Sequence, residues 1–296
     1  MNPPISPMNT VYHRSWRGRL FPLIWSLLLP VRLYLNLFPV QRGKGILLRH
    51  LVLPLLPPRE AEFDLRLPGD AKIALRYRET LGWSSLLYGT FELAELDYVR
   101  KYLRTGENAM DVGANVGIFS VLMGVTLGQS GRVFAFEPGP GNVVRLRRNL
   151  ERNRLSDAQV FPCALGEVDG QMTLNLARDP AYPSLVEVES GLGDGTGIPV
   201  QVRRLDSVWE ECGKPQIAFV KMDVEGAETA VIRGASHFLG ICRPTLLVEA
   251  NSPEQLEALE GLLGPFGYQA LQPDGFAPHN YLFYHPAWVA DRRPLA

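Results

Sequence analysis

The sequence D-V-G-A-N-V-G at Asp111–Gly117 joins a short apolar run to a segment of helical length. The run that leads into it, Ala109–Val112, suits a buried strand, and Ile118–Leu127 after it suits a helix. Glycines in such a turn let the backbone bend tightly and approach a ligand where a Cβ atom would collide. Because the spacing is G-x-x-x-G and not the G-x-G-x-x-G of dinucleotide-binding folds, we expect no pyrophosphate at this turn.

Beyond this turn, candidate strands and helices alternate along the chain. The candidate strands are Ala109–Val112, Val133–Phe136, Gln159–Pro162, Ala218–Met222 and Thr245–Val248. The candidate helices are Ile118–Leu127, Asn142–Asn153, Glu225–Leu239 and Pro253–Leu263. Short strands separated by helices of this length predict right-handed crossovers and a parallel sheet.

Two later segments depart from this alternation. Tyr268–Leu271 and Tyr281–Tyr284 are strand-like and are joined by Gln272–Asn280 without a helical pattern, so the last strand should run antiparallel. The stretch Ala177–Gly197 contains four glycines at alternate positions near its end, a spacing that favours neither helix nor strand. We therefore expect a loop there.

The segment before the turn has a different pattern of hydrophobic residues. Phe63–Leu67 and Lys72–Arg76 alternate in hydrophobicity around Pro68-Gly69-Asp70, which predicts a β-hairpin. Phe91–Leu103 carries apolar residues at helical spacing, with Thr90 available as its N-cap. We expect three regions: a basic, apolar helical segment at 1–60, the hairpin and helix at 61–105, and the main domain at 106–296.

Composition sets the class of protein and excludes several others. The chain has 296 residues, of which 46% are hydrophobic and 21% are charged, so a wholly disordered or fibrous chain is excluded. Three widely spaced cysteines without a C-x-x-C pair argue against a disulfide framework or a zinc ribbon. A reducing, cytoplasmic compartment is the simplest interpretation.

A second acidic position follows the next predicted strand, in Phe136-Glu137-Pro138. An acid at this strand end can accept hydrogen bonds from both hydroxyls of a ribose, as it does in nucleotide-binding α/β folds. Taken with the glycine turn, this acid predicts a site for a nucleoside that carries a small charged tail in place of a diphosphate.

Four motifs together resemble the FkbM family of S-adenosylmethionine-dependent methyltransferases. In chain order they are D-V-G-A-N-V-G, F-E-P, C-A-L-G at Cys163–Gly166 and K-M-D-V-E-G-A-E at Lys221–Glu228. The resemblance covers about Phe91 to His285, and it implies S-adenosylmethionine as the cofactor. It also implies an α/β fold of the class I methyltransferase (Rossmann-like) type, a seven-stranded sheet with an antiparallel last strand.

The resemblance also implies roles for individual residues of the main domain. The loop around the methionine part of the cofactor would consist of Asp111, Gly113, Asn115 and Gly117. Glu137, with Pro138 beside it, would hold the ribose, and Ala164 and Leu165 would lie beside the adenine. Asp223 and Glu225 would face the sulfonium and the acceptor at the end of the fourth strand.

Methyl transfer to a hydroxyl requires a group that takes the proton at or near the transition state. Ligands of open α/β sheets gather at the carboxyl ends of the strands, and five polar residues are expected there. They are Asp223, Glu225, Glu249, Asn251 and His279. We expect the general base among these residues. Asp223 is the first candidate, Glu225 and Glu249 are further candidates, and His279 is the alternative if Asp223 is not the base.

Oxygen atoms of Asp223, Glu249 and Asn251 are also of the kind that Mg²⁺ prefers. Capping and loop hydrogen bonding is the favoured interpretation of these three residues, so a divalent cation is allowed but no metal ligand is assigned. His237, inside a predicted helix, and His285, expected at the opposite end of the sheet, are interpreted as structural.

The sequence favours an O-methyltransferase that acts on a hydroxyl of a sugar, a glycan or another small natural product. A nicotinamide-dependent oxidoreductase is disfavoured by the missing G-x-G-x-x-G motif, and a non-catalytic binding protein of the same fold stays open. A nucleic-acid methyltransferase is disfavoured because the main domain is acidic and would repel phosphates. A homo-oligomer is left open.

The charge of the chain is unevenly distributed. The net charge is −1, but residues 1–59 contain eight Lys and Arg and no acid, so they carry +8 and the rest of the chain −9. The apolar run Leu20–Val31 is interrupted at Pro22 and Pro30 and followed by Arg32, which argues against a transmembrane helix. Two interpretations remain: contact with the anionic inner face of the cell membrane, or helices that pack on the main domain.

Overall fold

A computed structural model of the chain describes residues 55–57, 61–88, 92–177 and 193–289. These residues fall into two compact units. The smaller unit contains a hairpin of β1 (Glu62–Arg66) and β2 (Lys72–Arg76), followed by α5 (Thr80–Tyr88). The two strands pair antiparallel, with Glu62 opposite Arg76, so the predicted hairpin is confirmed. Residues 1–54 lie outside the described part, and so does the expected helical segment.

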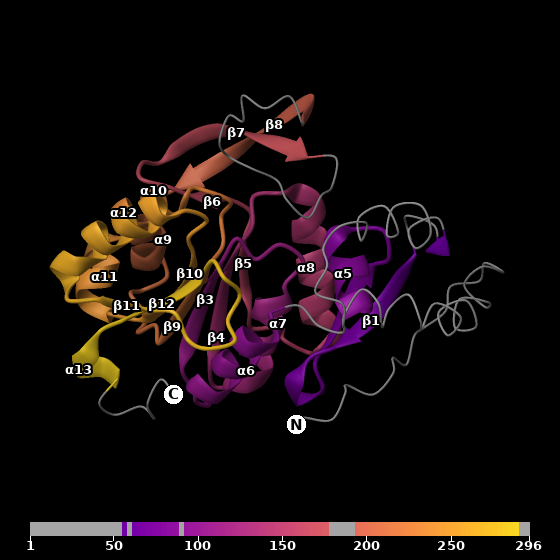
Figure 1. The fold of residues 1–296 in the computed structure, drawn as a ribbon, viewed down its shortest axis with the longest axis horizontal. Coiled ribbons are helices and arrows are strands. Elements are labelled where there is room, and N and C mark those ends of the chain that lie inside the picture. The colour runs from indigo at the N-terminus through magenta and orange to yellow at the C-terminus, as the bar shows by residue number, and fades with distance from the viewer. Residues whose placement is uncertain (1–54, 58–60, 89–91, 178–192, 290–296) are drawn as a thin grey trace. The chain divides into compact units, whose positions relative to one another are not determined.

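The larger unit contains Leu67–Ala71 and the chain from Glu92 onward. Within the described residues, seven of its strands form one sheet in the order β11-β12-β10-β9-β3-β4-β5 (Figure 1). The strands are β3 (Asn108–Val112), β4 (Arg132–Phe136), β5 (Gln159–Phe161), β9 (Phe219–Met222), β10 (Thr245–Glu249), β11 (Gln269–Leu271) and β12 (Asn280–Tyr284).

The strand directions match the sequence-based expectation. β5, β4, β3, β9 and β10 run parallel, and β12 runs antiparallel between β10 and β11. This is the class I methyltransferase fold that was predicted. The order changes direction between β3 and β9, and in open α/β sheets ligands bind outside the carboxyl ends of the strands at such a point.

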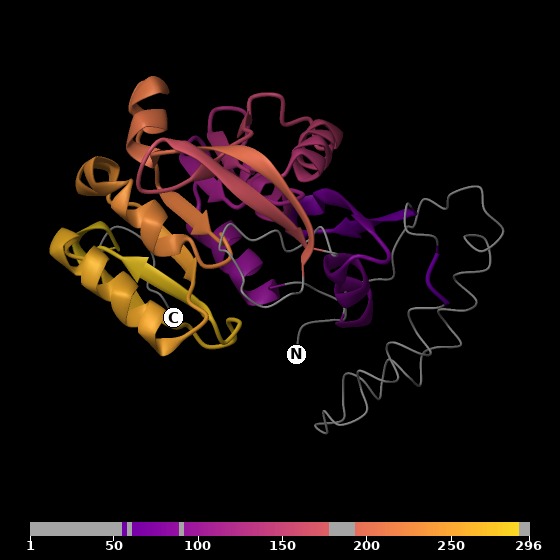
Figure 2. The same cartoon turned by 90° about the horizontal axis from the view of Figure 1, so that it is seen from above.

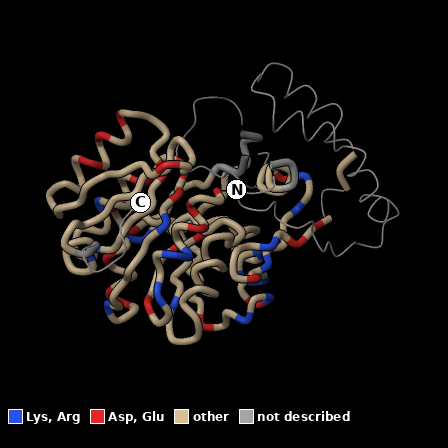
Figure 3. Tube along the Cα trace, turned by 60° about the horizontal axis from the view of Figure 1, so that its bottom comes forward, with Lys and Arg blue, Asp and Glu red and all other residues tan. Residues whose placement is uncertain are grey.

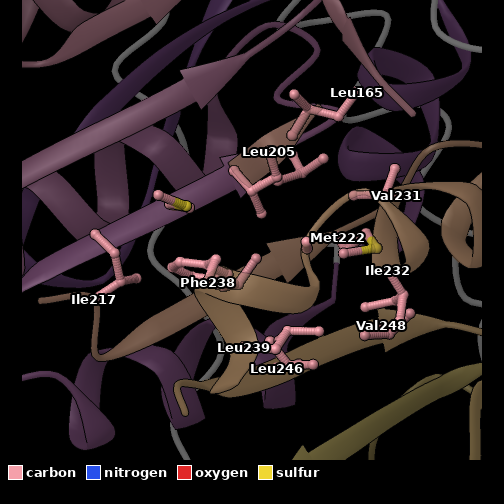
Figure 4. Close-up of a cluster of buried hydrophobic side chains, with 14 of the residues drawn as sticks. Leu165, Leu205, Ile217, Met222, Val231, Ile232, Phe238, Leu239, Leu246 and Val248 are labelled. Carbon is pink, nitrogen blue, oxygen red and sulfur yellow. The ribbon is translucent and has the colours of Figure 1, made fainter. Parts of the chain in front are cut away.

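Helices cover both faces of the sheet (Figures 1 and 2). One face packs against α9 (Leu205–Glu211), α10 (Glu228–Arg233), α11 (Ser236–Cys242) and α12 (Pro253–Leu263). Strand residues such as Met222, Leu246 and Val248 meet these helices in a buried apolar cluster (Figure 4). The other face lies under α6 (Leu93–Tyr102), α7 (Ile118–Leu127) and α8 (Pro140–Arg152). Because side chains alternate along a strand, Asp111 and Lys221, whose strand neighbours belong to the apolar cluster, point to this second face.

Three of the predicted elements need correction. Glu225–Leu239 is not one helix, because the chain leaves the helix after Arg233 and α11 starts at Ser236. The buried Asp206 carboxylate accepts hydrogen bonds from the N–H groups of His237 and Phe238, which fixes the new helix start. The N-cap of α6 is Glu92, with φ 45°, and not Thr90, which lies outside the described residues.

The third correction concerns Ala177–Gly197. Its last glycines belong to β8 (Gly193–Arg203), which pairs antiparallel with β7 (Gly170–Ala177) and parallel with β6 (Ala164–Leu165). The partner strand supplies the hydrogen bonds, and tertiary pairing overrides the weak strand propensity of glycine. Within the described residues, no helix is both long and apolar enough to span a membrane.

Candidate active site

The glycine turn lies between β3 and α7, at the centre of the sheet. Gly113 has φ 82°, and a Cβ atom there would lie 1.8 Å from the backbone oxygen of Asp223. Gly117 has φ 92°, and its Cβ would lie 2.5 Å from Leu146 Cδ1 on α8. At both positions a Cβ atom would collide with the protein itself. These glycines let the turn pack against β9 and α8.

Asp111 lies below this turn and is 2% exposed. Its Oδ2 accepts a hydrogen bond from the Ser120 hydroxyl on α7, 2.5 Å away. Burial raises the pKa of Asp111 to about 6, although the Ser120 hydrogen bond opposes the shift. The carboxyl is therefore fixed between strand and helix.

Glu137 connects the two turns that follow β3 and β4. Its Oε2 accepts the N–H of Asn115 at 2.8 Å, and its Oε1 accepts the N–H of Gly139 at 2.8 Å. Asn115 has φ 51°, a left-handed conformation that asparagine tolerates better than most residues. Burial raises the pKa of Glu137 to about 7, against the effect of these hydrogen bonds. Oε1 also accepts a hydrogen bond from the Asn142 side-chain amide at 3.4 Å, so Oε2 is the oxygen that retains a lone pair for a further donor.

The remaining predicted cofactor residues follow β4 and β5. Pro138 is half-buried between Glu137 and α8 in the chain. Ala164 and Leu165 form β6 and are 3% and 2% exposed. The side chain of Leu165 belongs to the apolar cluster (Figure 4). A ligand beside this strand would therefore meet mainly its backbone edge.

The D-V-E-G-A-E motif forms a tight turn after β9, and its last residue, Glu228, holds the turn together. Glu225 and Gly226 both have positive φ, 53° and 101°. The fully buried Glu228 accepts the N–H of Val224 at 3.1 Å and of Gly226 at 3.2 Å. Gln255 on α12 also donates to Glu228, at 2.5 Å. Sequence reasoning gave no role to Glu228, although its place at the end of the motif is a signal.

Acidic residues stand where β9 and β10 end. Figure 3 marks the acidic positions along the chain in red. Asp223 follows β9 and Glu249 ends β10, the neighbouring parallel strand. Burial and the nearby Asp223 raise the pKa of Glu249 to about 8. Burial and the same neighbour raise the pKa of Glu225 to about 7. The structure thus brings together three of the four predicted catalytic acids and bases.

Two further charged residues face this acidic group, and sequence reasoning missed both. Lys221 is 2% exposed, and its Nζ lies 3.8 Å from Asp223 Oδ2 and 5.3 Å from the centre of the Phe119 ring. Glu92 precedes α6 in a left-handed conformation, and burial raises its pKa. Lysine in the middle of an otherwise apolar strand was the available signal for Lys221. Residues in strained backbone conformations cluster at functional sites, but this signal for Glu92 is visible only in the structure.

His279 and Asn251 lie at the border of the site. His279 is exposed, and its backbone oxygen accepts the N–H of Ala250 at 2.7 Å. Asn251 is exposed and donates its N–H to Gln255 Oε1 at 2.8 Å.

The His237 ring lies 3.0 Å from Glu210 Oε1, and His285 follows β12 at the opposite end of the sheet, as expected. In the described part of the chain, no group of three or more His, Cys, Asp and Glu side chains could hold a metal ion.

The fold defines a class I methyltransferase-like protein, with acidic residues at the carboxyl ends of β9 and β10. The Methyltransferase FkbM domain model matches residues 111–270, which is more than half of the chain. The chain therefore belongs to the FkbM methyltransferase family.

Individual relatives agree with this assignment. The chain is 30% identical to 31-O-demethyl-FK506 methyltransferase FkbM of Streptomyces tacrolimicus, over 57% of this chain and 74% of that protein. It is 28% identical to hexuronic acid methyltransferase AglP of Haloferax volcanii, over 49% of this chain and 58% of that protein. A solved structure of methyltransferase FkbM from Methylobacillus flagellatus matches with 22% identity and a TM-score of 0.43, over 68% and 52% of the two chains. Matches to the curated relatives span 57% to 74% of their lengths.

Proposed function

We propose that this protein transfers a methyl group from S-adenosylmethionine to a hydroxyl of a saccharide or another small natural product. The observation that carries the proposal is Glu137, a buried carboxylate anchored by the N–H groups of Asn115 and Gly139 between two strand ends. Its Oε1 also accepts from the Asn142 amide, and the lone pair that Oε2 retains suits a hydroxyl of a ribose.

The acidic centre fits the charge of this cofactor. Burial and mutual repulsion raise the pKa of Glu225 to about 7 and that of Glu249 to about 8. A cation brought among such carboxyls favours their ionised forms and is itself stabilised. S-adenosylmethionine carries a sulfonium and an ammonium, and when bound it supplies an electrophilic methyl group whose bonding electrons stay on sulfur. Asp111, Glu225 and Glu249 would hold the cationic part.

The same centre can take a proton from an acceptor hydroxyl. Asp223 follows β9 with a half-buried carboxyl group, which would accept the proton as the hydroxyl oxygen forms its bond to the methyl carbon. Because the displacement is in-line, much of the rate enhancement comes from holding the oxygen and the methyl group collinear. Hydroxyl groups are proposed as acceptors because of the names of two relatives. One name contains an O-demethyl compound and the other a hexuronic acid.

Radioactive methyl transfer tests this proposal directly. The full chain is incubated with methyl-labelled S-adenosylmethionine and a panel of neutral sugars, hexuronic acids and polyhydroxylated macrolides, and the products are identified by mass spectrometry. We expect label in an ether-linked methyl group on one class of acceptor. Calorimetry should show binding of S-adenosylhomocysteine and none of NAD. Binding of NAD would favour the oxidoreductase alternative, and cofactor binding without transfer to any acceptor would favour a binding protein.

We also propose that the protein works in the cytoplasm and contacts an anionic membrane surface through residues 1–59. This segment has eight Lys and Arg and no acid, and each basic side chain contributes about 1 kcal/mol near anionic lipid. Sedimentation with phosphatidylglycerol vesicles should pellet the full chain at low salt and release it at high salt. A variant with these eight residues replaced by glutamine should stay in the supernatant, as should the unchanged protein with phosphatidylcholine vesicles. Equal sedimentation of both proteins would contradict the proposal.

A further inference from the structure

The loop between β11 and β12, residues 272–279, lies at the same end of the sheet as the acidic residues. The antiparallel register places Asn280, the first residue of β12, opposite Glu249, the last residue of β10. Residues directly opposite each other on neighbouring strands have their side chains on the same face of the sheet. Asn280 is therefore a neighbour of the acidic group. The loop extends from it past the carboxyl end of β10, where ligands of open α/β sheets bind.

The last part of this loop is a β-turn that carries His279. The N–H of Asn280 donates to the carbonyl oxygen of Ala277 at 3.0 Å, which closes a turn with Pro278 in its second position and His279 in its third. Proline is favoured in the second position because its φ is already fixed near the required value. His279 is exposed, and its backbone oxygen accepts the N–H of Ala250 at 2.7 Å. The turn thus holds an imidazole beside the end of β10.

Glu95 fixes both ends of this turn to α6. It lies in the first turn of that helix and is 1% exposed. Its Oε1 accepts the N–H of Ala277 at 2.6 Å and the side-chain amide of Asn280 at 3.0 Å. Asn280 is itself 2% exposed, and hydrogen bonds in such a buried place are electrostatically stronger than in water. One oxygen atom therefore anchors the backbone on both sides of His279.

Other contacts hold the rest of the loop. The Phe276 ring meets the Tyr98 ring of α6 edge to face, with the ring centres 5.7 Å apart. Within the loop, the side-chain amide of Gln272 donates to the carbonyl oxygen of Pro278 at 2.6 Å. The ring contact joins α6 to the middle of the loop, and Glu95 joins it to the turn.

We propose that Glu95 is a positioning residue: it holds the turn so that His279 forms a hydrogen bond with the acceptor while Asp223 takes the proton. This inference rests on the proposed function and adds the recognition of the acceptor to it. An imidazole ring can donate and accept hydrogen bonds, so it suits a hydroxyl of a sugar or another polyol. Glu95 is buried behind the turn and acts on the acceptor through His279.

Amide hydrogen exchange tests the anchor without an acceptor. In the full chain labelled with ¹⁵N, Glu95→Ala should speed the exchange of the Ala277 N–H at least about tenfold, because the oxygen that accepts this N–H is lost. Glu95→Gln keeps an acceptor oxygen at the same position and should retain most of the protection. Asp97→Ala, at an exposed acid on the same helix, is the matched control and should leave the exchange unchanged. Equal rates at Ala277 in folded Glu95→Ala and in the unchanged protein would overturn the proposal.

Kinetics with an acceptor from the labelling screen test the role of the turn. His279→Ala should raise the acceptor KM about 5–30-fold and change kcat less than about threefold, because a hydrogen bond made in both the ground state and the transition state is lost. Glu95→Ala should raise KM to a similar extent, and Glu95→Gln should restore most of it. The double variant should be no worse than His279→Ala, because Glu95 acts through this residue. Calorimetry should show unchanged binding of S-adenosylhomocysteine in each variant.

Losses that multiply in the double variant would overturn the proposal, because Glu95 would then act by another route. If Glu95→Ala does not fold, His279→Ala still decides, because His279 is exposed: an unchanged acceptor KM in that variant also overturns the proposal. If the exchange at Ala277 rises as expected but no acceptor is methylated, the proposed function fails and the anchoring of the turn by Glu95 stands.

Discussion

The strand ends at β3 and β4 differ from those at β9 and β10 in how their buried charges are satisfied. At the first edge, Glu137 is fixed by two backbone N–H groups at 2.8 Å. At the second edge, the Lys221 ammonium lies 3.8 Å from Asp223 Oδ2 and, among the described residues, has no hydrogen-bond partner. Hydrogen bonds to a carboxylate fix its position, whereas the pKa values of acids that lie close together change when a charged group binds beside them. We therefore expect the first edge to bind the cofactor and the second edge to take the proton.

The largest effect should come from the second edge. We expect Asp223→Asn to lower kcat for methyl transfer about 10²–10⁴-fold, because an amide cannot accept the hydroxyl proton. The affinity for S-adenosylhomocysteine, measured by calorimetry, should change much less. Asp97→Asn, on the exposed surface of α6, provides the matched control and should leave kcat unchanged.

Near-normal turnover in a folded Asp223→Asn variant would reduce Asp223 to a structural acid. His279 would then be the next candidate for the base, because its backbone is hydrogen-bonded to Ala250 just after Glu249. Such a result would also remove the distinction between a binding edge and a proton-transfer edge.

A somewhat smaller effect is expected where the turn after β3 packs against the turn after β9. In Gly113→Ala, the new methyl group would lie 1.8 Å from the Asp223 backbone oxygen, at a φ of 82° that alanine rarely adopts. We expect a loss of about 2–4 kcal/mol in the free energy of unfolding, measured with urea. In the same titration, Gly141→Ala should be neutral or stabilising by up to about 1 kcal/mol, because nothing lies within 4 Å of its Cβ position on α8. Equal stability of the two variants would show that the turns do not approach this closely.

Much of the first edge could be predicted from the sequence, and much of the second could not. The glycine turn and Glu137 occupy consecutive strand ends, so strand alternation and local motifs were enough to place them side by side. Lys221 and Glu92 are 129 residues apart in the sequence, and their electrostatic interaction depends on strand register and on how α6 packs. The break between α10 and α11 was missed for a similar reason, because Asp206, which caps α11, lies in another element.

The smallest effect should come from the first edge, where binding is spread over several groups. We expect Glu137→Ala to weaken S-adenosylhomocysteine binding by about 1–3 kcal/mol, through lost charge-assisted hydrogen bonds to the ribose. Glu254→Ala, at the exposed start of α12, is the control and should bind as the unchanged protein does.

The pH dependence of this affinity sharpens the test. Because burial raises the pKa of Glu137 to about 7, the free protein protonates this carboxyl as the pH falls through 7. A protonated carboxyl has fewer lone pairs for a ribose hydroxyl, so calorimetry should show weaker binding at about pH 6 than at pH 8. In Glu137→Ala this difference should shrink, because the titrating group is gone. An unchanged affinity in folded Glu137→Ala at both pH values would remove Glu137 from the cofactor site, and with it the reason to assign binding to this edge of the sheet.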